Sequence, residues 1–448
     1  MMTTTHRAAR RAAWYLGGAA IAAGALATAC KDVLKVQDPQ TFATEDLNAP
    51  QILKAVADGV EGQFQQIFDD HVVFSGLLSD EIIDTSTWID WADISLGRIR
   101  ADWPSAAPGW STTQDELLRT RFSAISAQER FKSVLGADAA KSPLMAQVRA
   151  TEGWADLILG MDYCEAPLVP GGPRQPDTEL IKQAITKFTD AIALAQAANA
   201  ADYLSWATAG RARANLLAGN YAAALADAQA VPAGYVKQAL YSTSSATSFP
   251  GNQLHVNRNR SGGLHRLWWA RVDTTPALGA GNAKATLYVK DPWSGQADRR
   301  MAVLHAPGQL GVNNSTPHYS IDKYGDYTAP ITITSKREMN LVAAEVYWRQ
   351  GDLARAVEQL NLNRTRAGVA LPAFAMPLTA GEVRDRLIAE RFAELFVEGH
   401  RLADLNRFGL VAQQLGPGRA MKMPLSRNEI LNNTSLKLGD ARCPGLTS

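Results

Sequence analysis

The chain has 448 residues, of which 46% are hydrophobic and 20% charged, and its formal net charge at pH 7 is +1. This length accommodates two or three ordinary domains or one large helical array. The near-neutral charge gives no reason to expect nucleic acid as a partner. The three cysteines lie too far apart in sequence for any two to form a metal-ligand pair.

Residues 1–29 are predicted to be a targeting segment, because arginines precede an Ala-rich apolar stretch and then small residues. A membrane span needs roughly 20 strongly apolar residues, and this run is shorter and weaker. The small residues directly before Cys30 resemble a bacterial lipoprotein box, with Leu26 one position earlier than usual. We therefore expect removal of the signal peptide, acylation of Cys30, and a polar tether over residues 30–48.

Tryptophans are unusually concentrated between residues 84 and 109, after the first predicted helix at 51–67. Trp88, Trp91 and Trp103 lie there among acidic residues and prolines. An exposed indole can stack on the apolar C–H face of a sugar ring, but tryptophan also fills cores. The sequence leaves both interpretations open for each of these residues.

Further helices are predicted from apolar spacing, and two segments resemble tetratricopeptide helix pairs. Residues 203–231 carry small residues on both helices and a turn at Gly219, and the arrangement returns around a turn at Gly351. Small residues allow two antiparallel helices to pack closely. These pairs predict a helical scaffold that is split by an insertion.

The insertion spans about residues 241–334 and is rich in Ser, Thr, Asn, Gly and Pro, with scattered aromatic residues such as Trp293. Short strand-like pieces are predicted at residues 287–289 and 331–333. Long irregular segments of a scaffold are usually functional or disordered, and the aromatic residues argue against disorder.

Residues 378–408 carry the strongest pattern in the chain. Thr379 and Glu382 have the spacing of a capping box, which predicts a helix start, and Gly399 indicates close packing or a break. Charged residues lie at spacings that let neighbours on one helix pair. The expected pairs are Arg386 with Glu390, Arg391 with Glu394, Glu398 with Arg401, and Arg401 with Asp404.

The same stretch resembles the C-terminal hallmark of the SusD/RagB family, because residues 390–409 read ERFAELFVEGHRLADLNRFG. The hallmark pairs E-R-x-x-E-L with F-E-G-x-R-x-x-D-L-x-R, and Val397 is a departure from it. Residues 361–368 and 423–432 resemble further family segments. The resemblance implies a mainly α fold: tetratricopeptide-like helix pairs form a scaffold with a loop-rich, mostly irregular insertion, in one SusD-like domain over residues 49–448.

Members of this family are surface lipoproteins that capture nutrients for TonB-dependent outer-membrane transporters. The resemblance implies that this chain binds an oligosaccharide, or a peptide as some members do. It also implies a SusC-like transporter as partner, a lipid anchor on the outer membrane facing the cell exterior, and no cofactor. The candidate ligand contacts are Trp88, Trp91, Trp103 and Trp293.

With Cys30 assigned to the lipid anchor, Cys164 and Cys443 remain as an even pair in an oxidising compartment. We predict a disulfide that ties the C-terminal tail to a helical hairpin. The alternative is two unrelated thiols.

Catalysis is not predicted, because the sequence contains no G-x-S-x-G, P-loop, H-E-x-x-H or C-x-x-C motif. The carboxylate pairs Asp69–Asp70 and Asp80–Glu81 could serve a glycosidase only at a defined separation across the bond. Two alternatives therefore stay open. One is a tetratricopeptide-type envelope scaffold with a smooth concave groove and the insertion packed elsewhere, and the less favoured one is a surface glycosidase.

Overall fold

The computed structural model describes residues 48–99, 109–242, 251–257, 260–274, 284–437 and 443. The predicted signal peptide, Cys30 and Trp103 lie outside these ranges. The chain divides into two units, Met1–Leu53 and Lys54–Ser448. In the described part of the first unit, Pro50–Ile52 form a short 3-10 helix, η2. The second unit holds the helical array and the sheets.

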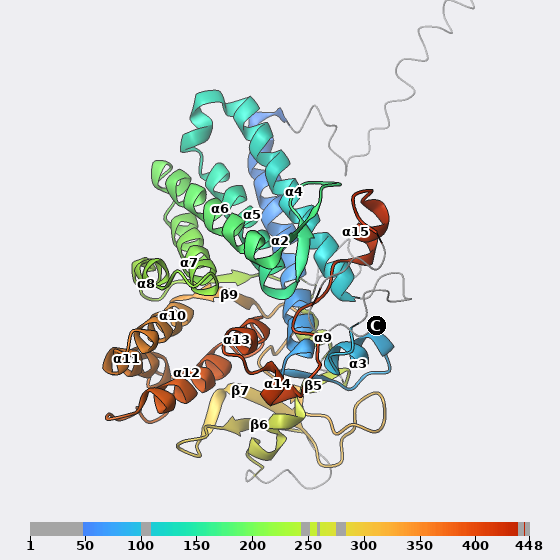
Figure 1. Cartoon of the computed structure of the whole chain (residues 1–448), viewed down its shortest axis with the longest axis vertical. Coiled ribbons are helices and arrows are strands. Elements are labelled where there is room, and N and C mark those ends of the chain that lie inside the picture. The colour runs from blue at the N-terminus through green and yellow to red at the C-terminus, as the bar shows by residue number, and fades with distance from the viewer. Residues whose placement is uncertain are drawn as a thin grey trace, which may run out of the picture. The chain divides into compact units, whose positions relative to one another are not determined.

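In the first half of this unit, most of the helices pack side by side in an array (Figure 1). The helices are α2 (Leu53–Leu78), α3 (Ile89–Ser95), α4 (Gly109–Leu135), η3 (Gly136–Lys141), α5 (Pro143–Asp162), α6 (Asp177–Ala197), α7 (Ala201–Leu217) and α8 (Tyr221–Ala230). Glycines bring α5 close to α6. A Cβ on Gly153 would lie 2.9 Å from the Phe188 ring, and one on Gly160 would lie 2.7 Å from Ile181.

The second half returns to the same array. Its helices are α10 (Lys336–Arg349), α11 (Leu353–Arg364), α12 (Ala380–Glu394), α13 (Arg401–Arg407), α14 (Val411–Leu415) and α15 (Arg427–Asn432). Gly219 and Gly351 make the turns of the two predicted helix pairs with φ of 78° and 80°, where a side chain would be strained. Ala224 of α8 and Val342 of α10 share one buried cluster, so the two pairs are adjacent in space despite the insertion (Figure 1).

The insertion is more regular than its composition predicts. It supplies β5 (Gly262–Leu264), β6 (Ala285–Lys290), β7 (Ala297–His305) and β8 (Ser320–Ile321), which join β1 (Ile82–Asp84) in a sheet of order β1-β5-β8-β7-β6. The pairs are antiparallel, with Ile82 opposite Leu264 and Leu287 opposite Val303. Helix α9 (Gln253–Asn257) and the 3-10 helix η4 (Arg266–Arg271) complete it. The predicted strand at 287–289 lies within β6.

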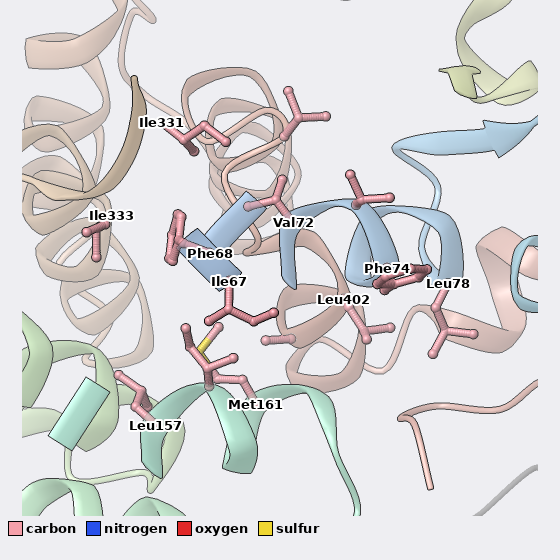
Figure 2. Close-up of a cluster of buried hydrophobic side chains, with 14 of the residues drawn as sticks. Ile67, Phe68, Val72, Phe74, Leu78, Leu157, Met161, Ile331, Ile333 and Leu402 are labelled. Atoms are coloured by element: carbon pink, nitrogen blue, oxygen red, sulfur yellow. The ribbon is translucent and has the colours of Figure 1, made fainter. Parts of the chain in front are cut away.

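Two smaller sheets connect the remaining segments. β9 (Ile331–Ser335), which contains the predicted strand at 331–333, pairs with β4 (Val236–Ala239), and β2 (Glu165–Pro167) pairs with β3 (Arg174–Pro176). The main core lies where α2 meets α5, β9 and α13 (Figure 2). It includes Ile67, Phe68, Val72, Phe74, Leu78, Leu157, Met161, Ile331, Ile333 and Leu402.

The capping box is present as predicted. The Glu382 amide donates to the Thr379 hydroxyl at 3.3 Å, and the Thr379 amide donates to the Glu382 carboxylate at 2.8 Å. Helix α12 ends at Glu394, and Gly399, with φ of 78°, lies in the turn before α13. A Cβ on Gly399 would lie 2.2 Å from Nε2 of His71, so this glycine serves both the break and the close packing.

The predicted charge pairs along residues 386–404 are wrong. Arg401 instead makes two bonds, of 2.6 and 2.8 Å, to Asp80 beyond the end of α2, and Glu398 accepts from Lys323 at 2.8 Å. Arg391 makes two bonds, of 2.8 and 2.9 Å, to Asp404. The physical reason is burial, because these groups face the core and so meet partners from other elements. The remaining partners are Arg300 and Arg364 for Glu390, and Arg300, Arg337 and Arg366 for Glu394.

A disulfide joins Cys164, in the connection after α5, to Cys443 in the C-terminal tail, with their Cα atoms 5.5 Å apart. The pairing is the one predicted from the sequence. The Cys164 amide also donates to the Met423 carbonyl at 3.0 Å, so the C-terminal segment follows the α5–α6 connection.

Replacing Arg401 with Met should destabilise the fold by about 3–5 kcal/mol, because Asp80 would keep a buried charge without a partner. Urea unfolding followed by circular dichroism measures the change. Lys182→Met is the control, since Lys182 and Glu179 form an exposed pair worth at most about 1 kcal/mol. Equal losses in the two variants would contradict the importance of the buried pair.

Cys443→Ser should lower the free energy of unfolding by about 2–4 kcal/mol, since the cross-link restricts the unfolded chain. Urea titrations of the oxidised wild type and the variant measure this loss. Adding a reductant should bring the wild type to the level of the variant and leave the variant unchanged. If the urea midpoint of the wild type stays the same when the reductant is added, the disulfide does not contribute the expected stability.

Candidate functional site

A cleft of about 840 Å³ opens between α2, α4, α9 and the turn before α3. Its volume is within the range of roughly 300–1,000 Å³ that small-molecule sites occupy. Helix α2 presents one face to it, with lining residues at i, i+3, i+4 and i+7, and α4 presents another. The lining residues are Gln63, Gln66, Ile67, Asp69, Asp70, Trp88, Trp91, Thr112, Glu116, Arg119, Gln253, Val256 and Asn257.

Trp88 is held at the cleft by a turn whose polar groups bond to one another. The Asp84 carboxylate accepts from the Ser86 amide at 3.0 Å and from the Ser86 hydroxyl at 2.6 Å. The Ser86 hydroxyl in turn accepts from the Trp88 amide at 3.0 Å. The backbone is thus fixed while the Trp88 side chain stays 48% exposed, so its ring is available for contact.

The Trp91 ring packs against the Trp88 ring. The two rings are 4.9 Å apart in a T-shaped arrangement, and Trp91 packs against Phe74 at 6.0 Å. Trp91 is only 7% exposed and belongs to the main hydrophobic core. The sequence left open whether each tryptophan is a core residue or an exposed ring. Trp91 is mainly a core residue, and Trp88 is an exposed ring.

The other two tryptophan candidates do not join this pair. Trp103 lies outside the described residues. Trp293 lies between β6 and β7, where its ring meets Phe374 at 5.3 Å and the Arg386 guanidinium lies 5.3 Å from the ring centroid. Trp293 is 38% exposed but does not line the cleft.

From the sequence alone, Asp69 and Asp70 stood out only as a carboxylate pair that could serve a glycosidase. Asp69 is buried and accepts from the Asp70 and Gln253 amides, both at 2.8 Å, so it fixes the start of α9 against α2. Asp70 lines the cleft, and burial together with the charge of Glu116 raises the pKa of Asp70 to about 6. The sequence did contain a signal for this face of the cleft, because the polar residues Gln63, Gln66 and Asp70 recur at i, i+3 and i+7 on α2.

The second carboxylate pair is inaccessible to a ligand. Asp80 is fully buried and bonded to Arg401, and Glu81 accepts from the Val397 amide at 2.8 Å. Burial raises the pKa of Glu81 to about 8, outweighing the opposing effects of that bond and of Arg401. Neither residue lines the cleft, so this pair offers no support for a glycosidase.

Across the described ranges, no group of three or more His, Cys, Asp or Glu residues is placed to hold a metal ion. Nor does any helix there combine the length and apolarity that crossing a membrane requires.

The model of the SusD family matches residues 322–435, which include the hallmark stretch and α10 to α15. The C-terminal part of the chain is therefore similar to the SusD family. The resemblance stated from residues 390–409 is thereby confirmed, and so is the mainly α fold. No curated protein matches this chain.

Solved structures of SusD proteins share the fold. A SusD superfamily protein from Bacteroides vulgatus matches with a TM-score of 0.62 at 14% identity, covering 86% of this chain and 97% of its own. A SusD-like protein from Bacteroides fragilis gives 0.64 at 12% identity, with coverages of 88% and 98%. A SusD-like carbohydrate binding protein from Bacteroides vulgatus gives 0.58 at 13% identity, with coverages of 80% and 83%. At these identities the likeness concerns the fold.

Glu81→Gln should flatten the pH dependence of the stability of this protein. The folded-state pKa of Glu81 is raised from 4.5 to about 8, so the unfolded chain loses this proton first as pH rises. The contribution to stability therefore falls by about 1.4 kcal/mol per pH unit between those values and levels off above them. The variant keeps an acceptor for the Val397 amide and cannot ionise.

Urea unfolding of both proteins from about pH 5 to about pH 8 measures the effect. The free energy of unfolding of the variant should increase relative to that of the wild type as the pH rises. Parallel curves would contradict a buried, protonated Glu81.

Proposed function

We propose that this protein is a cell-surface lipoprotein that captures an oligosaccharide and delivers it to a SusC-like, TonB-dependent outer-membrane transporter. The observation that carries the proposal is the cleft of about 840 Å³ with the exposed Trp88 ring, in a chain whose residues 322–435 match the SusD family. A structurally similar protein is described as a SusD-like carbohydrate binding protein.

Capture relies on the flat face of Trp88. A sugar ring places its apolar C–H groups on the indole, and the amides of Gln63, Gln66 and Asn257 offer donors and acceptors to its hydroxyls. Trp91, which packs on Phe74, contacts the Trp88 indole and limits its movement, so little side-chain freedom is lost on binding. Binding without bond cleavage is sufficient for this role, and the proposal includes no catalytic step.

Anchoring completes the proposal. Signal peptide removal after residue 29 leaves Cys30 for acylation, and residues 30–48 tether one SusD-like domain over residues 49–448. The disulfide between Cys164 and Cys443 supports an exported protein, because disulfides persist in oxidising compartments.

A scaffold without a small ligand is less well supported. That role favours a smooth helical groove with the insertion packed elsewhere. Here the insertion supplies Gln253, Val256 and Asn257 to a cleft that it shares with α2 and α4. A cleft built from both parts favours capture of a small ligand.

Trp88→Ala should weaken oligosaccharide binding at least about tenfold, since truncating a central aromatic contact costs about 2 kcal/mol or more. Affinity electrophoresis in gels containing soluble glycans, both neutral and amino-bearing, identifies a retained glycan, and calorimetry then measures its Kd. Trp293→Ala is the matched control, because it removes an exposed indole that does not line the cleft.

The control should stay within about twofold of the wild type. Retention that survives Trp88→Ala but is lost in Trp293→Ala would move the site to the β6–β7 turn. Retention of peptides and of no glycan would replace the proposed ligand class.

A further inference from the structure

We infer that the cleft selects a cationic oligosaccharide, one whose sugar rings carry free amino groups. This inference rests on the oligosaccharide capture proposed above and names the ligand class of the same site. The volume of the cleft and the exposed Trp88 ring define the site. The charged residues that line it define what the ligand must carry.

The described lining is negatively charged. It contains the carboxylates of Asp69, Asp70 and Glu116 and the guanidinium of Arg119, which leaves a formal charge of −2. Arg119 donates to Glu116 at 2.6 Å from the next turn of α4, so the cation is already engaged. Burial and the neighbouring Asp70 raise the pKa of Asp69 well above its usual range, so the uncompensated negative charge that a ligand meets in the cleft rests on Asp70.

The three carboxylates differ in their hydrogen-bond and ion-pair partners. Asp69 accepts from two backbone amides, which carry no net charge. Glu116 has Arg119. For Asp70, no donor is present among the residues that the structure describes, although its carboxylate lines the cleft. A ligand can therefore supply the donor that the Asp70 carboxylate lacks within the described part of the chain.

The surroundings of Asp70 favour a charged donor over a neutral one. Burial and the facing Glu116 charge both disfavour ionised Asp70, as its raised pKa shows. A sugar hydroxyl can donate a hydrogen bond to this carboxylate but cannot cancel its charge. An ammonium group does both, and such charge-assisted bonds are the stronger kind.

Asp70 and the stacking platform can engage one ligand. Asp70 comes from α2, Glu116 from α4, and Trp88 from the turn before α3, and all three line the same cleft. A sugar ring stacked on Trp88 projects its substituents around the ring edge. An amino substituent can therefore meet a carboxylate while the ring stays on the indole.

Two tetrasaccharides of one backbone test the inference: β-1,4-linked glucosamine with free amines, and the same chain fully N-acetylated. Calorimetry at low salt should show the wild type binding the free amine form at least about tenfold more tightly. The ratio should shrink as salt is added, because screening weakens attraction between charges. Trp88→Ala should weaken both tetrasaccharides.

Asp70→Asn should bring the ratio of affinities close to one, since it removes the charge and keeps the shape. Glu116→Gln provides a second variant, which removes the neighbouring charge and releases Arg119. Asp385→Asn is the control, because it makes the same change on an exposed residue that does not line the cleft. Melting curves establish that each variant is folded.

Equal affinity for the two tetrasaccharides, or a ratio that Asp70→Asn leaves unchanged, would overturn the inference. Binding of the neutral form that depends on Trp88 would in that case leave oligosaccharide capture standing. Binding of tetralysine without either sugar would also overturn the inference, in favour of a basic peptide. Absence of binding to any glycan tested would refute the proposed function itself.

Discussion

The fold depends on buried charges that must find partners. The hallmark helices α12 and α13 place Glu390, Glu394 and Arg401 out of contact with water, and an isolated ion there would cost several kcal/mol. Their partners come from β7, α10, α11 and the end of α2. Each pair is satisfied only when those elements occupy their native positions. The network therefore fixes how the helical array, the sheet and α2 meet, which non-directional apolar packing specifies less sharply.

This network positions the cleft without lining it. Arg401 holds Asp80, and two residues later the chain enters β1, which leads into the turn that carries Trp88. β1 is also paired with β5 of the insertion. On the other side of the cleft, Asp69 of α2 accepts from the first amide of α9. The insertion is thus tied beside the site twice, to β1 by a strand pair and to α2 by a carboxylate.

Local patterns in the sequence predicted local structure well. The capping box at Thr379, the glycine turns of the helix pairs and the even pair of cysteines each depend on spacing or on counting, and the structure contains all three. The charge pairs failed because spacing along a helix describes a solvent-exposed face, whereas these charges face inward. β5 and β8 are too short for alternation to be visible. Distinguishing Trp88 from Trp91 required knowing that Phe74 lies behind the second ring.

The separation between frame and site has a consequence for how the ligand is specified. Residues that hold the frame are buried and mutually dependent, so a change in one leaves another charge unpaired. Gln63, Gln66 and Asp70 instead project from the cleft face of α2, and the opposite face already secures that helix in the core. Their replacement alters the chemistry offered to a ligand while the apolar contacts of α2 remain. In the proposed oligosaccharide site, ligand preference is therefore expected to depend on a few side chains on one helical face, and the charge of Asp70 is the feature among them proposed to separate one sugar from another.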